Sequence, residues 1–298
     1  MKVSERSGLL YALAGFAVLS LGDVVVKTMA GLWAPTAVAS LRFTIGAIGL
    51  GALLLVRQGP SGFSIPHPKV QLLRGAGLAL ATAGFFSAIF VMPLATAASI
   101  TFTSPMVTAF LAAMFLGEPL RRETAIASLV AFAGVLVVLR PNFAALGWAA
   151  MLPLVAALGM SMLMIGNRFV AGKASPLLMQ FLVAAIAAPL LLLAAIGFHI
   201  SGIAGFSVGW PEWSVVARCA LIACTASFAH WLLFLATTRA GAATIAPVTY
   251  SQLLIATLAG WLLFGDHPDG ATLVGSAMII AAGLYLWRAN SARLAQRS

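Results

Sequence analysis

Long apolar stretches alternate with short polar connections along the whole chain. There are ten such stretches, each bounded by charged residues, glycines or prolines. About 20 consecutive apolar residues are enough for an α-helix to cross the hydrocarbon core of a bilayer. The pattern therefore predicts ten transmembrane helices, at residues 8–28, 34–56, 71–92, 95–116, 123–140, 146–166, 175–198, 213–236, 242–264 and 270–288.

The amino-acid composition indicates that lipid, rather than water, is the main solvent of this chain. Hydrophobic residues make up 62% of the 298 residues and charged residues 8%, with a mean hydropathy of +1.05. A soluble domain carries about a quarter charged residues, and the apolar stretches leave no room for one. We expect an all-α membrane protein with a single transmembrane domain.

The basic residues indicate how the chain is oriented in the membrane. The net charge of +10 would suggest a nucleic-acid partner in a soluble protein, but here the lysines and arginines lie in short loops beside apolar stretches. With the N-terminus inside, thirteen of them fall on the cytoplasmic side and only Lys27 and Arg140 outside. The positive-inside rule then predicts that both termini are cytoplasmic and that Asp266 and Asp269 face outward. The thirteen are Lys2, Arg6, Arg57, Lys69, Arg74, Arg121, Arg122, Arg168, Lys173, Arg239, Arg288, Arg293 and Arg297.

The two halves of the chain resemble each other. Matching residues recur at offsets that rise slowly from 141 to 148, as duplicated halves with small insertions would give. Because each half holds five spans, an odd number, the halves must cross the membrane in opposite directions. We predict two inverted five-helix repeats, 1–142 and 143–298, an arrangement found in many secondary transporters. The matches are Lys27, Ala30, Gly31 and Pro35 with Arg168, Ala171, Gly172 and Pro176; Arg74 with Arg218; Ala95, Ala97, Ala98, Ser99 and Ile100 with Ala240, Ala242, Ala243, Thr244 and Ile245; and Gly117-Glu118 with Gly265-Asp266.

The fourth and ninth spans carry the most suggestive polar residues. Pro105 and Pro247 each remove a backbone hydrogen bond inside an apolar stretch, and freed carbonyls are tolerated where protein or a water-lined cavity satisfies them. A face of hydroxyls accompanies them, and each hydroxyl has the alternative of bonding to its own helix. The candidate substrate-binding residues here are Ser99, Thr103, Tyr250, Ser251 and Gln252.

These motifs resemble a known family. Ten spans arranged as five plus five, the pair Leu41-Arg42 in the second span and the turn LGEPLRRE after the fourth are similar to the EamA family of the drug/metabolite transporter superfamily. Among its branches, the chain looks most like the YddG-type exporters of aromatic and other amino acids. The resemblance implies an inner-membrane carrier that exports metabolites, with spans one, three, four, six, eight and nine lining its path. The second half departs from the pattern, with Gly265-Asp266 and then His267 in place of the usual Gly-Glu.

Charged residues inside the spans are candidates for gating or coupling. Asp23 and Lys27 lie four residues apart on one helix face, within reach of each other, and Arg42 lies in the second span. One interpretation is a salt bridge near the outer end of the first span. The other is a gate or a proton-binding site, although a nearby Lys or Arg holds a carboxylate ionised.

An aromatic and apolar set completes the candidate binding residues. His230 near the middle of the eighth span is either a bridge between helices or a substrate contact. Phe85, Phe86 and Trp231 lie deep in their spans, and together with Met160 and Met164 they predict an adaptable apolar pocket. Such a pocket suits side chains of varied size.

The sequence favours transport over catalysis. It contains no nucleophile motif, phosphate-binding loop or metal-ligand spacing, and Cys219 and Cys224 are five residues apart in one apolar stretch. We therefore expect no cofactor and no enzyme, but a lipid-embedded secondary transporter that exports amino acids or similar amphiphilic metabolites by alternating access. The alternative is a proton-coupled exporter of drugs or toxic compounds. Small-residue faces in the tenth span favour packing within a monomer over a dimer interface.

Overall fold

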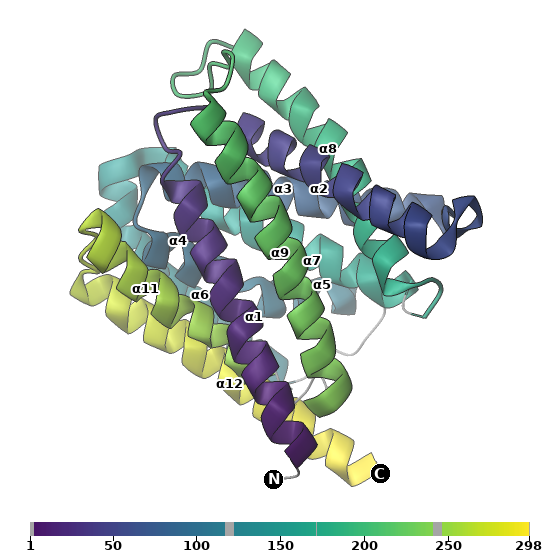
Figure 1. Ribbon diagram of the computed structural model, residues 1–298. Coiled ribbons are helices and arrows are strands. Elements are labelled where there is room, and N and C mark those ends of the chain that lie inside the picture. Colours follow the sequence, from purple (N-terminus) through teal and green to yellow (C-terminus); the bar gives the residue numbers. More distant parts are fainter. Residues whose placement is uncertain (1–2, 117–121, 171, 241–245, 298) are drawn as a thin grey trace. The chain divides into compact units, whose positions relative to one another are not determined.

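Helices make up every element in the part of the chain that the computed structural model describes, residues 3–116, 122–170, 172–240 and 246–297 (Figure 1). The Gly117-Glu118 turn and Thr244 lie outside these ranges. The elements are α1 (Val3–Lys27), α2 (Pro35–Gln58), η1 (Pro60–Gly62), α3 (Pro68–Val91), α4 (Leu94–Thr101), α5 (Ser104–Leu116), α6 (Arg122–Leu146), η2 (Gly147–Met151), α7 (Leu152–Val170), α8 (Pro176–Ile200), α9 (Trp213–Ala240), η3 (Ala246–Tyr250), α11 (Ser251–Phe264) and α12 (Gly270–Arg297).

The helical segments reproduce the expected order of spans. Within the described residues, eight segments are long and apolar enough to cross a membrane, and two shorter apolar helices, Ala125–Leu139 and Val248–Phe264, fall where the fifth and ninth spans were predicted. The prediction of an all-α, multi-span membrane protein is confirmed.

Local sequence explains where several helices begin. Pro35 and Pro176 are the first residues of α2 and α8, a position where the missing N–H has no helical partner to lose. The Ser175 hydroxyl accepts a hydrogen bond from the Leu178 N–H at 3.2 Å and caps α8, as serine does at many helix N-termini.

The helices pack into two compact units that do not coincide with the two halves of the sequence. Unit 1 comprises residues 1–25, 92–150 and 225–298, and unit 2 comprises residues 26–91 and 151–224. Each unit therefore draws helices from both halves of the chain, and α1 and α9 contribute residues to both.

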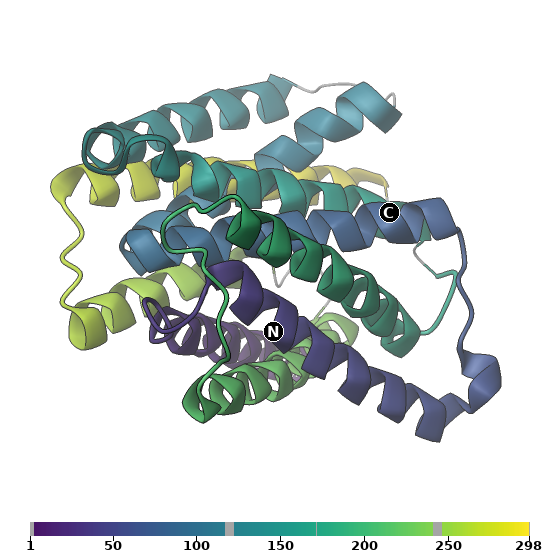
Figure 2. The same cartoon turned by 90° about the horizontal axis from the view of Figure 1, so that it is seen from above.

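Unit 2 is built around two close helix pairs. Figure 2 shows α2 and α8 running side by side, and the Ser40 hydroxyl in α2 donates to the Ala188 carbonyl in α8 at 3.3 Å. In the second pair, α3 and α7 approach so closely that a Cβ added at Gly77 or Gly84 would lie 2.8 Å from a carbonyl oxygen of α7. Glycine permits this backbone contact, as in many membrane helix pairs.

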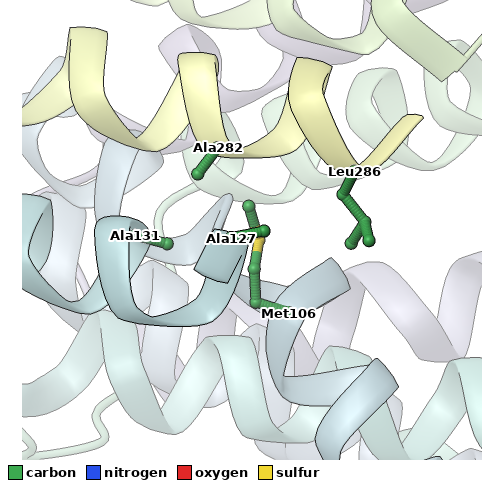
Figure 3. Close-up of a cluster of buried hydrophobic side chains, with 5 residues drawn as sticks. All are labelled: Met106, Ala127, Ala131, Ala282 and Leu286. Atoms are coloured by element: carbon green, nitrogen blue, oxygen red, sulfur yellow. The ribbon is translucent and has the colours of Figure 1, made fainter. Parts of the chain in front are cut away.

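Unit 1 contains a similar contact between α6 and α12. A Cβ at Gly134 would lie 2.8 Å from the Gly275 carbonyl oxygen, and a Cβ at Gly275 would lie 2.5 Å from the Gly134 carbonyl oxygen. Next to this contact, a buried apolar cluster joins α5, α6 and α12 (Figure 3). Its members are Met106, Ala127, Ala131, Ala282 and Leu286.

Candidate functional site

The fourth predicted span is interrupted near its middle. Helix α4 ends at Thr101 and α5 begins at Ser104, and Pro105 cannot supply the N–H that the Thr101 carbonyl would accept in a continuous helix. At the break, the Ile100 carbonyl accepts hydrogen bonds from the Thr103 N–H at 3.1 Å and from the Thr103 hydroxyl at 2.7 Å. The Ile100 carbonyl at the break is therefore satisfied locally, by the backbone N–H and the hydroxyl of Thr103.

The ninth predicted span changes its helix type at the corresponding place. Residues Ala246–Tyr250 form the 3₁₀ helix η3, which contains Pro247, and the α-helical segment α11 starts at Ser251. Short 3₁₀ segments commonly occur where an α-helix cannot continue. Both proline-containing spans are thus irregular near their prolines, and both lie in unit 1.

Polar and aromatic side chains meet around these two irregular segments. The Tyr250 ring lies 5.8 Å from the Phe102 ring, and its hydroxyl packs so closely on Gly283 of α12 that no Cβ fits there. The Ser99 and Ser276 hydroxyls lie 2.6 Å apart and join α4 to α12. These contacts bring α4, η3 and α12 together within unit 1.

A further contact extends this cluster to α1. The buried Ser20 hydroxyl donates to the Gln252 carbonyl at 3.3 Å. The adjacent Ser251 hydroxyl is buried and has no hydrogen-bond partner among the described atoms. A buried hydroxyl without a partner costs free energy. Thr36 and Ser128 have such hydroxyls as well, but Ser251 is the one in the irregular ninth span, where it offers hydrogen-bonding capacity for a bound solute.

The predicted residues in unit 2 form a separate group. The Arg42 guanidinium carbon lies 4.6 Å from the centre of the Phe43 ring and 5.7 Å from that of the buried Phe86 ring. These distances are within the range of cation–π attraction, so the structure brings Arg42, a gating candidate, next to Phe86, a candidate of the apolar pocket, a pairing that the sequence did not suggest. Met164, also in unit 2, is 42% exposed on α7.

The remaining predicted residues lie on α1 and α9. Asp23 and Lys27 are both half-buried on one face of α1. His230 and Trp231 are exposed on α9, where the His230 Nδ1 lies 2.7 Å from the Ala226 carbonyl oxygen of the same helix. The Trp231 ring lies 5.8 Å from the Phe228 ring.

Sequence reasoning missed a buried polar cluster around Arg74 in α3. Arg74 is 4% exposed, and its Nε donates to the Asn167 side-chain oxygen at 2.7 Å, while Nη1 contacts the Gln71 side-chain oxygen and the Met179 sulfur. The sequence pattern indicated only that Arg74 is a cytoplasmic positive charge and the repeat mate of Arg218. The polar residues Gln71 and Arg74, three apart near the start of an apolar helix, were the signal available for it.

A groove in unit 1 was also missed. It has a volume of about 490 Å³ and is lined mainly by apolar residues of α11 and α12, together with Ala95 of α4. Thr272 and Ser276 supply polar atoms from α12, and His267 lies at one end of the lining. Thr272 and Ser276 are four residues apart in the sequence, which places both on one helix face, and this spacing was the signal available for the groove. Among the described residues, no three His, Cys, Asp or Glu side chains cluster in a way that would hold a metal ion.

The apolar helices and the interrupted spans are typical of a membrane transporter. The sequence model of the EamA-like transporter family matches residues 6–140 and again 147–288. The chain therefore belongs to this family, and the predicted family membership is confirmed.

Curated relatives with similar sequences are named as transporters. The S-adenosylmethionine uptake transporter of Rickettsia bellii is 27% identical over 90% of this chain and 88% of its own length. The riboflavin transporter of Rhizobium johnstonii is 29% identical over 78% of this chain and 75% of its own length. The pseudopaline exporter CntI of Pseudomonas aeruginosa is 26% identical over 95% of this chain and 96% of its own length. The expectation of a transporter rather than an enzyme is confirmed.

A solved crystal structure has the same fold. It superposes with a TM-score of 0.60 and 22% sequence identity, over 94% of this chain and 97% of the other. At this identity the likeness concerns the fold alone. The similarity to YddG-type exporters in particular stays a prediction.

Proposed function

We propose that the chain is a secondary transporter that exports small amphiphilic metabolites, amino acids among them, by alternating access. The observation that carries the proposal is the pair of interrupted spans in unit 1, with the partnerless Ser251 hydroxyl and the Tyr250 phenol at the second of them. Irregular helices at membrane depth are where secondary transporters bind their solutes.

The chemistry of this region favours a solute with both polar and apolar parts. The Tyr250 and Phe102 rings lie 5.8 Å apart, Ser251 and Gln252 directly follow Tyr250 in the chain, and Thr103 directly follows Phe102. Two of the named relatives carry S-adenosylmethionine and riboflavin, both polar molecules with a flat ring system, which agrees with such a solute.

The proposed mechanism rests on duplicated, inverted halves. It is supported by the family model, which matches the chain twice, in residues 6–140 and 147–288, and by the irregular segments at corresponding places in the two halves. The distribution of lysine and arginine supports cytoplasmic termini. The bacterial relatives support a location in the plasma membrane.

Counterflow in proteoliposomes tests this proposal. Vesicles are loaded with an unlabelled neutral amino acid, and uptake of the same radiolabelled amino acid is followed with and without a pH gradient. We expect saturable exchange of at least one aromatic or aliphatic amino acid, slowed by Tyr250→Phe. A matched control is Thr108→Ala, because the Thr108 hydroxyl bonds to the Ser104 carbonyl of its own helix at 2.7 Å.

Two results would argue against parts of the proposal. No saturable exchange of any amino acid would exclude this substrate class. Uptake of lipophilic cations that depends on a pH gradient and is lost in Asp23→Asn would instead favour the proton-coupled exporter of drugs.

A further inference from the structure

The helix α4 is short and depends on its surroundings for its position. It has 8 residues, Leu94–Thr101, and those from Leu94 to Ile100 are buried. An isolated helix of about two turns is not stable by itself in water, and the break at Phe102 and Thr103 separates α4 from α5. Contacts with the surrounding helices α6, α11 and α12, and at its two ends, therefore decide where α4 lies.

The N-terminus of α4 lacks a cap from its own sequence. The capping position is occupied by Pro93, which has no side-chain acceptor, although the first N–H groups of any helix need partners outside it. The Leu94 N–H finds one in the Asp266 carboxylate at 3.3 Å, although the two residues are 172 positions apart. A negative charge is also favoured at the positive end of a helix dipole.

The backbone that carries Asp266 is itself held in place. Helix α11 ends at Phe264 and is capped by Gly265, whose φ of 65° is the left-handed conformation typical of a helix end. The Gly265 N–H donates to the Trp261 carbonyl at 3.2 Å, and the Asp266 N–H donates to the Gly260 carbonyl at 3.0 Å. The first of these is the bond of an αL helix cap, and with the second it fixes the backbone from which the carboxylate projects to α4.

The other end of α4 carries the residues of the proposed binding region. Ser99 bonds to Ser276, and Phe102, directly after α4, contacts the Tyr250 ring. A change at the Asp266 end would therefore move groups that lie next to the proposed solute site. Ala95 of α4 and His267 also line the groove in unit 1.

From these contacts we propose that Asp266 is a positioning residue that holds the half-helix α4 closed at its outer end, so that loss of the carboxylate lets α4 open toward the outside. The inference rests on the proposed alternating-access function and on the outward placement of Asp266 by the positive-inside rule. It gives a role to the acid that replaces the usual glutamate of the family motif. The carboxylate acts through the helix rather than by touching the solute.

Sided thiol labelling tests this inference without any need for a transported substrate. A background without Cys219 and Cys224 carries the single reporter Thr96→Cys, since Thr96 is on α4 and is 2% exposed. A membrane-impermeant maleimide is added from the outer or the cytoplasmic side of the vesicles. We expect Asp266→Ala to raise the rate of labelling from the outer side by about fivefold, within the roughly two- to thirtyfold range that loss of a helix cap corresponds to. Asp266→Asn should give a smaller increase.

Two controls separate this effect from general loosening. Asp269→Asn alters a neighbouring acid that caps its own helix α12, where the Thr272 N–H bonds to it at 2.7 Å, and should leave the reporter unchanged. A second reporter, Ser161→Cys on α7, where Ser161 is fully buried, should stay slow in every variant.

The inference is overturned if Thr96→Cys is labelled no faster in the Asp266 variants, if Asp269→Asn has the same effect, or if Ser161→Cys becomes reactive in parallel. If Asp266→Ala does not yield folded protein, the comparison of Asp266→Asn with Asp269→Asn decides the question. If the Asp266 variants change the labelling rate as expected but no amino acid is exchanged, only the proposed substrate is rejected. Exchange without any labelling shift would reject only the role of Asp266.

Discussion

Two helix contacts that correspond in the proposed repeat, α7 with α3 and α1 with α9, are packed in different ways. The α7–α3 contact in unit 2 has glycines on both helices, and a Cβ at Gly159 would lie 2.6 Å from the Gly77 carbonyl oxygen. In the α1–α9 contact of unit 1 the described glycines facing the partner lie on α1. A Cβ at Gly8 would lie 2.9 Å from the Ala240 nitrogen, and a Cβ at Gly15 would meet the Leu233 side chain at 3.0 Å and the Ala229 carbonyl oxygen at 3.1 Å. The contrast is therefore between Gly159, whose nearest neighbours are backbone atoms of α3, and Gly15, whose nearest neighbour is a leucine that can change its rotamer.

A buried serine in each of these two contacts has a different kind of hydrogen-bond partner. Ser20 in α1 and Ser161 in α7 are 141 positions apart, the offset of the repeat, and both are buried. The Ser161 hydroxyl donates to the Ala157 carbonyl of its own helix at 2.8 Å, whereas the Ser20 hydroxyl donates to the Gln252 carbonyl of α11. Equivalent serines thus serve local structure in unit 2 and a contact with an irregular span in unit 1. We interpret the α7–α3 contact as the more rigid of these two helix contacts.

The largest expected effect is on the stability of unit 2. Gly159→Ala places a methyl group against the backbone of α3, and overpacking of this kind costs about 3 kcal/mol. Gly15→Ala should cost about 1 kcal/mol, because Leu233 can move. Thermal unfolding in detergent, followed by loss of monodisperse protein, measures both. Gly46→Ala is the matched control, since nothing lies within 4 Å of a Cβ at that helical glycine; equal losses for Gly159→Ala and Gly15→Ala would contradict the contrast between the two contacts.

A smaller effect is expected at the hydroxyl pair of unit 1. Ser99→Ala and Ser276→Ala each remove one member of the contact between α4 and α12, and such hydrogen bonds in membranes are worth about 0.6 kcal/mol. In a double-mutant cycle, the two losses should be coupled, so that the double variant is little worse than either single one. Strictly additive losses would show that the two hydroxyls do not stabilise each other.

The smallest effect concerns pH and Asp269. The pKa of Asp269 is lowered because the Thr272 side chain and backbone N–H donate hydrogen bonds to its carboxylate. The stabilisation is therefore present above the ordinary pKa of about 3.9 and is lost as the pH falls through the lower pKa of the folded protein. Since Asp269 is exposed, the contribution should stay below about 1 kcal/mol. The unfolding midpoint of the wild type should fall more steeply below about pH 4 than that of Asp269→Asn. If the midpoints of both proteins fall in parallel with pH, the Asp269 carboxylate does not stabilise the fold.

The sequence predicted the membrane fold well because span length and hydropathy are local properties. The positions of Pro105 and Pro247 also indicated which spans would be irregular. The partners of the hydroxyls could not be read in the same way, since Ser99 and Ser276 are 177 positions apart and only tertiary packing brings them together. Similarly, nothing local to Asp266 indicated that its carboxylate would reach the start of α4.

The placement of the solute beside Ser251 is the central claim, and protection of that position from labelling tests it most directly. In a background without native cysteines, Ser251→Cys is exposed to a small maleimide in the presence and absence of the amino acid that exchanges in proteoliposomes, with Thr108→Cys as the reference. We predict that saturating amino acid slows labelling of Ser251→Cys severalfold and leaves Thr108→Cys unchanged. Labelling of Ser251→Cys that is indifferent to the solute, while exchange proceeds, would contradict the account.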